Sequence, residues 1–158
     1  MPVVDEIREA NLSYASEFEK GDLPMPPGRK FAVVTCMDAR LDPAKFLGLD
    51  EGDAHVIRNA GAVVTDDALR SLIISHHLLG TQEAVVIAHT DCGMLTFEDE
   101  ELQDRLNTDV DFHAFPDVEE NVWSGVKKIQ DSSLLPDSFA ARGFVYDVNT
   151  GELREVPG

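Results

Sequence analysis

The sequence predicts a single α/β domain over residues 1–158, with a mainly parallel central sheet flanked by helices and an antiparallel C-terminal edge hairpin. Three observations support this fold class. Continuous apolar runs at 31–35 and 84–88 are typical of strands buried on both faces. Helical patterns alternate with strands through the central half of the chain, as in parallel sheets. At 144–156, an Asn-Thr-Gly turn separates two β-favouring segments, which is typical of a hairpin.

Residues 3–20 are expected to form an N-terminal helix, because most of their apolar side chains recur at helical spacing. The apolar stripe is thin for a helix that is supported only by its own domain. The Pro-rich stretch at 24–28 ends the helix and forms a stiff linker. Residues 1–28 are therefore expected to pack either on the parent domain or on a partner subunit.

The first strand of the central half, at 31–35, is followed by a short helix. Asp42 is suited to the N-cap of this helix, and Pro43 stands at its first position. A second short strand is expected at 54–57. Strand, helix and strand in this order predict the beginning of a parallel sheet.

A strongly apolar helix is expected over 66–79. Thr65 is suited to its N-cap and Gly80 to its C-terminal end. The strand at 84–88 follows, and a further helix is expected over 117–130, where apolar residues recur on one face.

Composition excludes several classes of function. The 30 acidic and 13 basic residues give a formal net charge of −17, so the chain has no basic stripe for nucleic acid or anionic lipid. The acidity is typical of a well-solvated surface. No apolar run approaches the roughly 20 residues of a membrane span, and the N-terminus lacks the features of a signal peptide. We therefore expect a cytoplasmic protein.

The only two cysteines, Cys36 and Cys92, lie at or just beyond the ends of two predicted strands. His89 ends the second of these strands, three residues before Cys92. Ligands of open α/β sheets bind outside the carboxyl ends of the strands, so these three side chains are expected to converge. Two thiolates and an imidazole favour zinc over magnesium or calcium.

Other interpretations of these residues remain open. Cys36 alone would suit a small buried apolar residue, and His89 alone would suit a hydrogen-bonded residue at a strand end. Cys36 and Cys92 form no Cys-x-x-Cys motif, which makes a redox pair a weaker interpretation. A disulfide framework is excluded by a count of two.

Three motifs lie between about residues 30 and 97. They are Cys36-x-Asp38-x-Arg40, Arg58-Asn59-Ala60-Gly61 and His89-Thr90-Asp91-Cys92-Gly93. In order and separation they together resemble the signature of the β-class carbonic anhydrases, and in particular its small bacterial and archaeal branch.

The resemblance implies one zinc ion per chain, held by Cys36, His89 and Cys92. Its fourth position would hold water or hydroxide in an active form, and Asp38 in a closed form. The spacing of Asp38 and Arg40 allows a bidentate ion pair. While paired, Asp38 would stay off the metal and orient the nucleophile toward the substrate.

Three neighbouring residues are expected to have smaller roles. Arg58 and Asn59 would brace the loop beside the metal, and Asp91 would hydrogen-bond within its own turn.

The resemblance implies an enzyme that hydrates carbon dioxide reversibly to bicarbonate by attack of zinc-bound hydroxide. A hydrolase of carbonyl sulfide or carbon disulfide would use the same site, and a non-catalytic zinc or redox-sensing domain is a third possibility. Because family members build their sites at a dimer interface, we expect a homodimer or homotetramer. The substrate of such an enzyme would be a small neutral gas.

Overall fold

The computed structural model describes all 158 residues and contains one five-stranded sheet of order β2-β1-β3-β4-β5. The first four strands in this order pair in parallel, and β4 and β5 pair antiparallel at the edge. This confirms the predicted fold class. The strands are β1 (Phe31–Cys36), β2 (Ala54–Asn59), β3 (Glu83–His89), β4 (Ala140–Tyr146) and β5 (Leu153–Val156).

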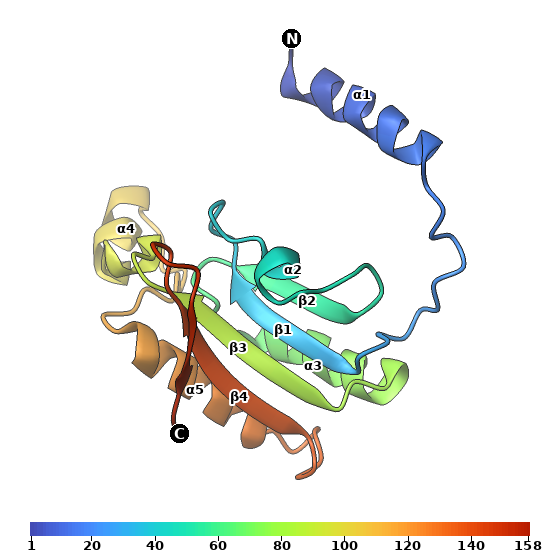
Figure 1. The fold of residues 1–158 in the computed structure, drawn as a ribbon. Coiled ribbons are helices and arrows are strands. Elements are labelled where there is room, and N and C mark those ends of the chain that lie inside the picture. Colours follow the sequence, from blue (N-terminus) through green and yellow to red (C-terminus); the bar gives the residue numbers. More distant parts are fainter.

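Helices lie on both sides of the sheet. In Figure 1, α3 and α5 lie behind it, and the short α2 lies in front. None of the helices is long and apolar enough to cross a membrane. The helical elements are α1 (Val3–Ser16), α2 (Pro43–Phe46), α3 (Asp66–Leu79), the 3-10 turn η1 (Gly93–Leu95), α4 (Asp99–Leu106) and α5 (Val118–Gln130).

α3 begins and ends at its predicted capping residues, and α5 lies within one residue of its predicted bounds. Thr65 Oγ1 accepts a hydrogen bond from the Ala68 amide at 3.1 Å, and Gly80 ends α3 in the left-handed conformation. Asp117 caps α5 in the same way, by accepting from the Glu120 amide at 2.9 Å. The Asp42 side chain makes no such bond before α2.

Glycine allows α5 to approach the sheet closely. A Cβ atom at Gly143 of β4 would overlap the Val122 side chain, and one at Gly125 of α5 would lie 2.7 Å from Val64. Val122 is fully buried between these elements. The close approach covers the middle of β3 and β4, so this part of the core is rigidly packed.

Two helices differ from the sequence expectation. α1 ends at Ser16 rather than near residue 20, none of its residues is buried, and Figure 1 shows it standing away from the sheet. α4 was not predicted, because its sequence, DEELQDRL, has only two apolar residues and no continuous apolar face.

The sheet brings the two chemically unusual strand ends together. β1 and β3 pair in parallel, with Thr35 opposite Ile87, so Cys36 and His89 end neighbouring strands at the same edge. Thr35 Oγ1 also donates a buried hydrogen bond of 2.7 Å to the Ile87 carbonyl. β2 flanks β1 on its other side, where Cys36 pairs with Asn59.

Candidate metal centre

Three potential metal ligands converge at the carboxyl ends of β1 and β3. Cys36 ends β1, His89 ends β3, and Cys92 precedes the turn η1. Their ligand atoms all lie within 4.8 Å of one another, and all three residues are buried. The backbone brings them together, because each occupies the end of a core strand or the turn that follows it.

The orientation of the His89 ring fits a metal ligand. Nδ1 lies 2.7 Å from the Thr90 carbonyl oxygen, which can only accept, so Nδ1 carries a proton and donates. Nε2 is buried and has no hydrogen-bond partner. A buried nitrogen without a partner is unfavourable, and a metal ion between Nε2 and the two sulfurs would satisfy it. Two sulfur donors and one imidazole suit zinc.

The pKa values of the two thiols are shifted in opposite directions. Interaction with the Cys92 thiol, together with His89 and nearby amides, lowers the pKa of Cys36. The same interaction and burial raise the pKa of Cys92. Burial of His89 is the largest single effect and lowers its pKa, but Cys36, the Thr90 carbonyl and Asp38 together outweigh burial and raise the pKa of His89. Without metal, the three groups therefore retain a proton on Cys92 and hold His89 more readily in its charged form.

Gly61 supports Cys36 from the loop after β2. Its amide donates to Cys36 Sγ at 3.3 Å, and its carbonyl accepts from Asn121 Nδ2 of α5 at 2.9 Å. The φ of +94° requires glycine, and a Cβ atom would lie 2.8 Å from Phe115 and 2.9 Å from Met94. The residue spacing did not reveal the contribution of Asn121, because it lies 60 residues away in sequence.

Asp38 and Arg40 form the bidentate pair that their spacing allows. Arg40 Nε and Nη2 donate to the two Asp38 oxygens at 3.0 and 2.8 Å. These hydrogen bonds hold the pKa of the Asp38 carboxyl well below its usual range. Asp38 Oδ2 lies 3.6 Å from His89 Nε2, so an ionised carboxylate stands beside the point where the ligand atoms converge.

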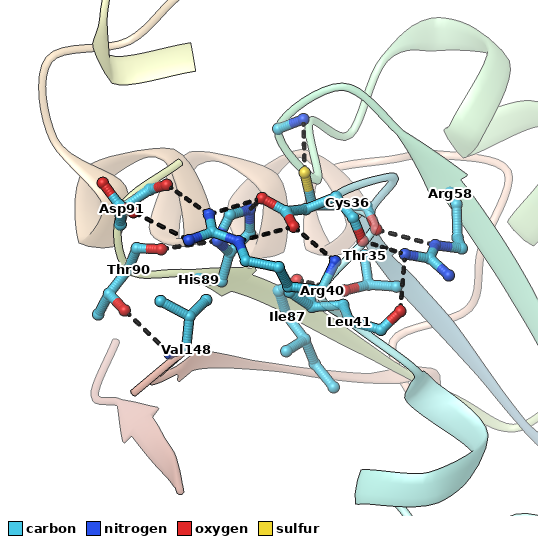
Figure 2. Close-up of polar contacts among 12 residues, drawn as sticks. Thr35, Cys36, Arg40, Leu41, Arg58, Ile87, His89, Thr90, Asp91 and Val148 are labelled. Atoms are coloured by element: carbon cyan, nitrogen blue, oxygen red, sulfur yellow. Dashed lines mark hydrogen bonds and ion pairs between the residues drawn. The ribbon is translucent and has the colours of Figure 1, made fainter. Parts of the chain in front are cut away.

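Arg58 and Asn59 brace the surrounding loops, as expected. The Arg58 guanidinium donates to the carbonyls of Cys36, Asp38 and Leu41, at 2.8, 2.9 and 3.2 Å. Figure 2 shows Arg58 beside Cys36 and Leu41. Asn59 closes its own loop by bonding both the amide and the carbonyl of Val63.

The expectation for Asp91 was wrong. Its carboxylate does not bond within its own turn but accepts from Arg40 Nη1 at 2.9 Å (Figure 2). The two residues lie 51 positions apart, so only the folded loops reveal the contact.

Comparison with known proteins places the chain in a family. The family model described as carbonic anhydrase matches residues 31–112. β-Carbonic anhydrase 1 of Mycobacterium tuberculosis is 48% identical over 162 aligned positions, which cover 99% of each chain. The chain belongs to the β-carbonic anhydrase family. The fold and the predicted motifs thus agree with this family assignment.

Two further relatives place it within this family. The crystal structure of the carbonic anhydrase from Streptococcus mutans shares 44% identity, with a TM-score of 0.92 and 99% of both chains covered. Carbon disulfide hydrolase of Acidianus sp. is 34% identical over 90% of this chain and 83% of its own length. Proteins named for a different substrate are therefore also among the relatives of this chain.

The proton on Cys92 predicts that metal binding depends on pH. Metal ligation requires thiolates and a neutral imidazole, so Zn²⁺ must displace the Cys92 proton and any proton on His89. We expect release of between one and two protons per chain near pH 7, and zinc affinity that rises about tenfold per pH unit for each proton displaced. Calorimetry in buffers of different ionisation enthalpy measures this number.

The Cys92→Ser variant is the control for that measurement, because it removes the thiol proton. Zinc binding with no proton release by the unsubstituted protein would show that Cys92 is not protonated in the metal-free site.

Proposed function

We propose that the protein catalyses the reversible hydration of carbon dioxide to bicarbonate and a proton, with one zinc ion per chain. The observation that carries the proposal is the convergence of two thiols and one unpartnered imidazole nitrogen beside an arginine-held carboxylate. The 48% identity to a β-carbonic anhydrase over 99% of the chain supports the same reaction.

In this proposal Cys36, His89 and Cys92 hold the zinc ion. Three protein ligands would leave the fourth position of a tetrahedral zinc ion to a reacting molecule, as a catalytic zinc site requires. Zinc, when bound, supplies a nucleophile from water at neutral pH. The Gly61 amide stabilises the negative charge on Cys36, and the Thr90 carbonyl fixes the proton of His89 on Nδ1.

Asp38 and Arg40 are proposed to orient the reacting water. An ionised carboxylate only accepts hydrogen bonds, so Asp38 would accept one from that water and turn an oxygen lone pair toward carbon dioxide. Arg40 holds Asp38 in its ionised form, and a carboxylate paired in this way would stay off the metal. If the pair opened, Asp38 would be close enough to the ligand atoms to become the fourth ligand itself.

A hydrolase of carbonyl sulfide or carbon disulfide is the second candidate. Both molecules are linear and neutral, like carbon dioxide, and the same nucleophile would attack them. Carbon disulfide hydrolase of Acidianus sp. is 34% identical, against 48% for the mycobacterial carbonic anhydrase, so carbon dioxide is the favoured substrate.

Stopped-flow measurement of proton release from carbon dioxide tests this choice. We expect the zinc-loaded protein to hydrate carbon dioxide, with kcat/KM at least tenfold above its value for sulfide release from carbonyl sulfide or carbon disulfide. A protein that holds one zinc per chain and only releases sulfide would reverse the order of the two candidates.

Variants of the site test the residue roles. Asp38→Ala is expected to retain zinc and lose roughly 10²-fold in kcat, as typical for loss of a positioned proton acceptor, and Cys36→Ser to lose zinc or activity. Glu155→Ala is the matched control, because it breaks another bidentate pair, with Arg142, at the β4–β5 edge. Full activity of Asp38→Ala would show that the carboxylate does not orient the nucleophile.

We further propose that the protein is a homodimer or a dimer of dimers, in which α1 packs on a partner subunit. The helix is exposed along its length, and the apolar side chains of Ile7 and Leu12 within it, and of Phe18 just beyond its end, are about half or more exposed to solvent. Apolar surface of this kind is unfavourable unless another molecule covers it. We propose a second copy of this chain as the molecule that covers the helix, because such a copy is always present in solution.

Light scattering of the full chain measures the oligomeric state. We expect a mass of at least twice the 17.4 kDa of one chain. A stable and active monomer would contradict the proposal.

A cytoplasmic location is also proposed. Both cysteines are free thiols at a candidate metal site, and a reducing compartment keeps such thiols available for metal.

A further inference from the structure

The far edge of the Arg40 guanidinium makes contacts that the proposed mechanism does not use. Nε and Nη2 face Asp38, while Nη1 donates to Asp91 Oδ2 at 2.9 Å, and Nη2 also donates to the Asp91 carbonyl at 2.9 Å. A guanidinium has five N–H donors in a fixed plane, so two acceptors on opposite edges determine its orientation. Figure 2 shows the Arg40 guanidinium beside Asp91.

We propose that Asp91 is a positioning residue that holds Arg40 in the orientation in which it retains Asp38. The proposal rests on the proposed function, because its effect on rate is through the role of Asp38. Asp91 touches neither the ligand atoms nor the reacting water in this assignment, and it acts through Arg40.

The position of Asp91 in the fold makes it an effective anchor. Asp38 and Arg40 share the loop after β1, whereas Asp91 lies in the turn after β3. That turn is fixed on its other side, since the Thr90 amide donates to the Tyr146 carbonyl at 2.9 Å and Thr90 Oγ1 accepts from the Val148 amide at 3.1 Å. Asp91 therefore ties the Arg40 side chain to a rigid part of the sheet.

Exposure to water explains why Asp38 alone would hold Arg40 weakly. The Arg40 side chain is 48% exposed, and solvent-exposed ion pairs hold long side chains loosely. The Asp91 carboxylate is itself 77% exposed, but it binds the opposite edge of the planar guanidinium, so the two carboxylates together restrict the orientation of Arg40 more than Asp38 does alone. Without Asp91, Arg40 would leave Asp38 more often, and Asp38 would be free to turn toward the metal ligands.

The backbone at Asp91 determines which variants are informative. Its φ is +54°, a left-handed conformation that aspartate, asparagine and glycine adopt more readily than other residues. Asp91→Gly therefore removes the carboxylate while retaining the backbone and its carbonyl acceptor. Asp91→Asn keeps one acceptor oxygen but loses the charge. Asn107→Gly is the matched control, because Asn107 has a φ of +52° and lies at the end of α4.

The test combines two measurements. In the metal-free protein, the ¹⁵N heteronuclear NOE of the Arg40 Nε–H reports the order of this side chain directly. In the zinc-loaded protein, carbon dioxide hydration gives kcat and KM. We expect Asp91→Gly to reduce the NOE of Arg40. We also expect it to lower kcat about three- to tenfold and to change KM less than twofold, because it lowers only the fraction of molecules in which Arg40 holds Asp38. The NOE and the kcat of Asp91→Asn should lie between those of Asp91→Gly and those of the unsubstituted protein.

The outcomes separate this proposal from the proposed function. An unchanged NOE, or an unchanged kcat, in both Asp91 variants would overturn the positioning role, as would an equal loss in Asn107→Gly. If the unsubstituted protein failed to hydrate carbon dioxide while Asp91→Gly still lowered the NOE, the proposed function would fail and the anchoring of Arg40 by Asp91 would stand.

Discussion

β1 and β3 lie side by side and run in the same direction, and the chemistry of the site depends on this pairing. Because the register sets Thr35 opposite Ile87, the next residues of the two strands reach the same edge of the sheet. Cys36 and His89 are thus brought together by backbone hydrogen bonds rather than by flexible side chains. The buried His89 Nε2 is left without a hydrogen-bond partner, and a metal ion bound between the three side chains would supply one.

Two arginines at this edge act on different kinds of acceptor. Arg58 donates to three main-chain carbonyls and so fixes the backbone of the loop after β1. Arg40 donates to two carboxylates and one carbonyl, and so fixes side chains. Together they fix both the loop backbone and the Asp38 carboxylate beside the ligand atoms. In the proposed mechanism, that carboxylate decides whether the fourth metal position is open to a reacting molecule or closed.

Much of this arrangement could be predicted from the sequence, because continuous apolar runs identified β1 and β3, and ligand-type residues stand at their ends. Capping residues such as Thr65 and Gly80 identified helix ends for the same local reason. Contacts between loops could not be predicted. The Gly61 amide on Cys36 and the Asp91 carboxylate on Arg40 join residues 25 and 51 positions apart, and depend on left-handed backbone at Gly61 and Asp91. α4 was not predicted, because it has too few apolar side chains for a helical repeat to be recognised.

X-ray absorption at the zinc K edge, on protein loaded with one Zn²⁺ per chain, tests the central claim most directly. If Cys36, His89 and Cys92 hold the metal, the first shell contains two sulfur atoms at about 2.3 Å and two nitrogen or oxygen atoms at about 2.0–2.2 Å. One of the lighter atoms is the His89 nitrogen, and the other occupies the fourth position. A shell with fewer than two sulfur atoms, or failure to bind one zinc per chain, would contradict the account.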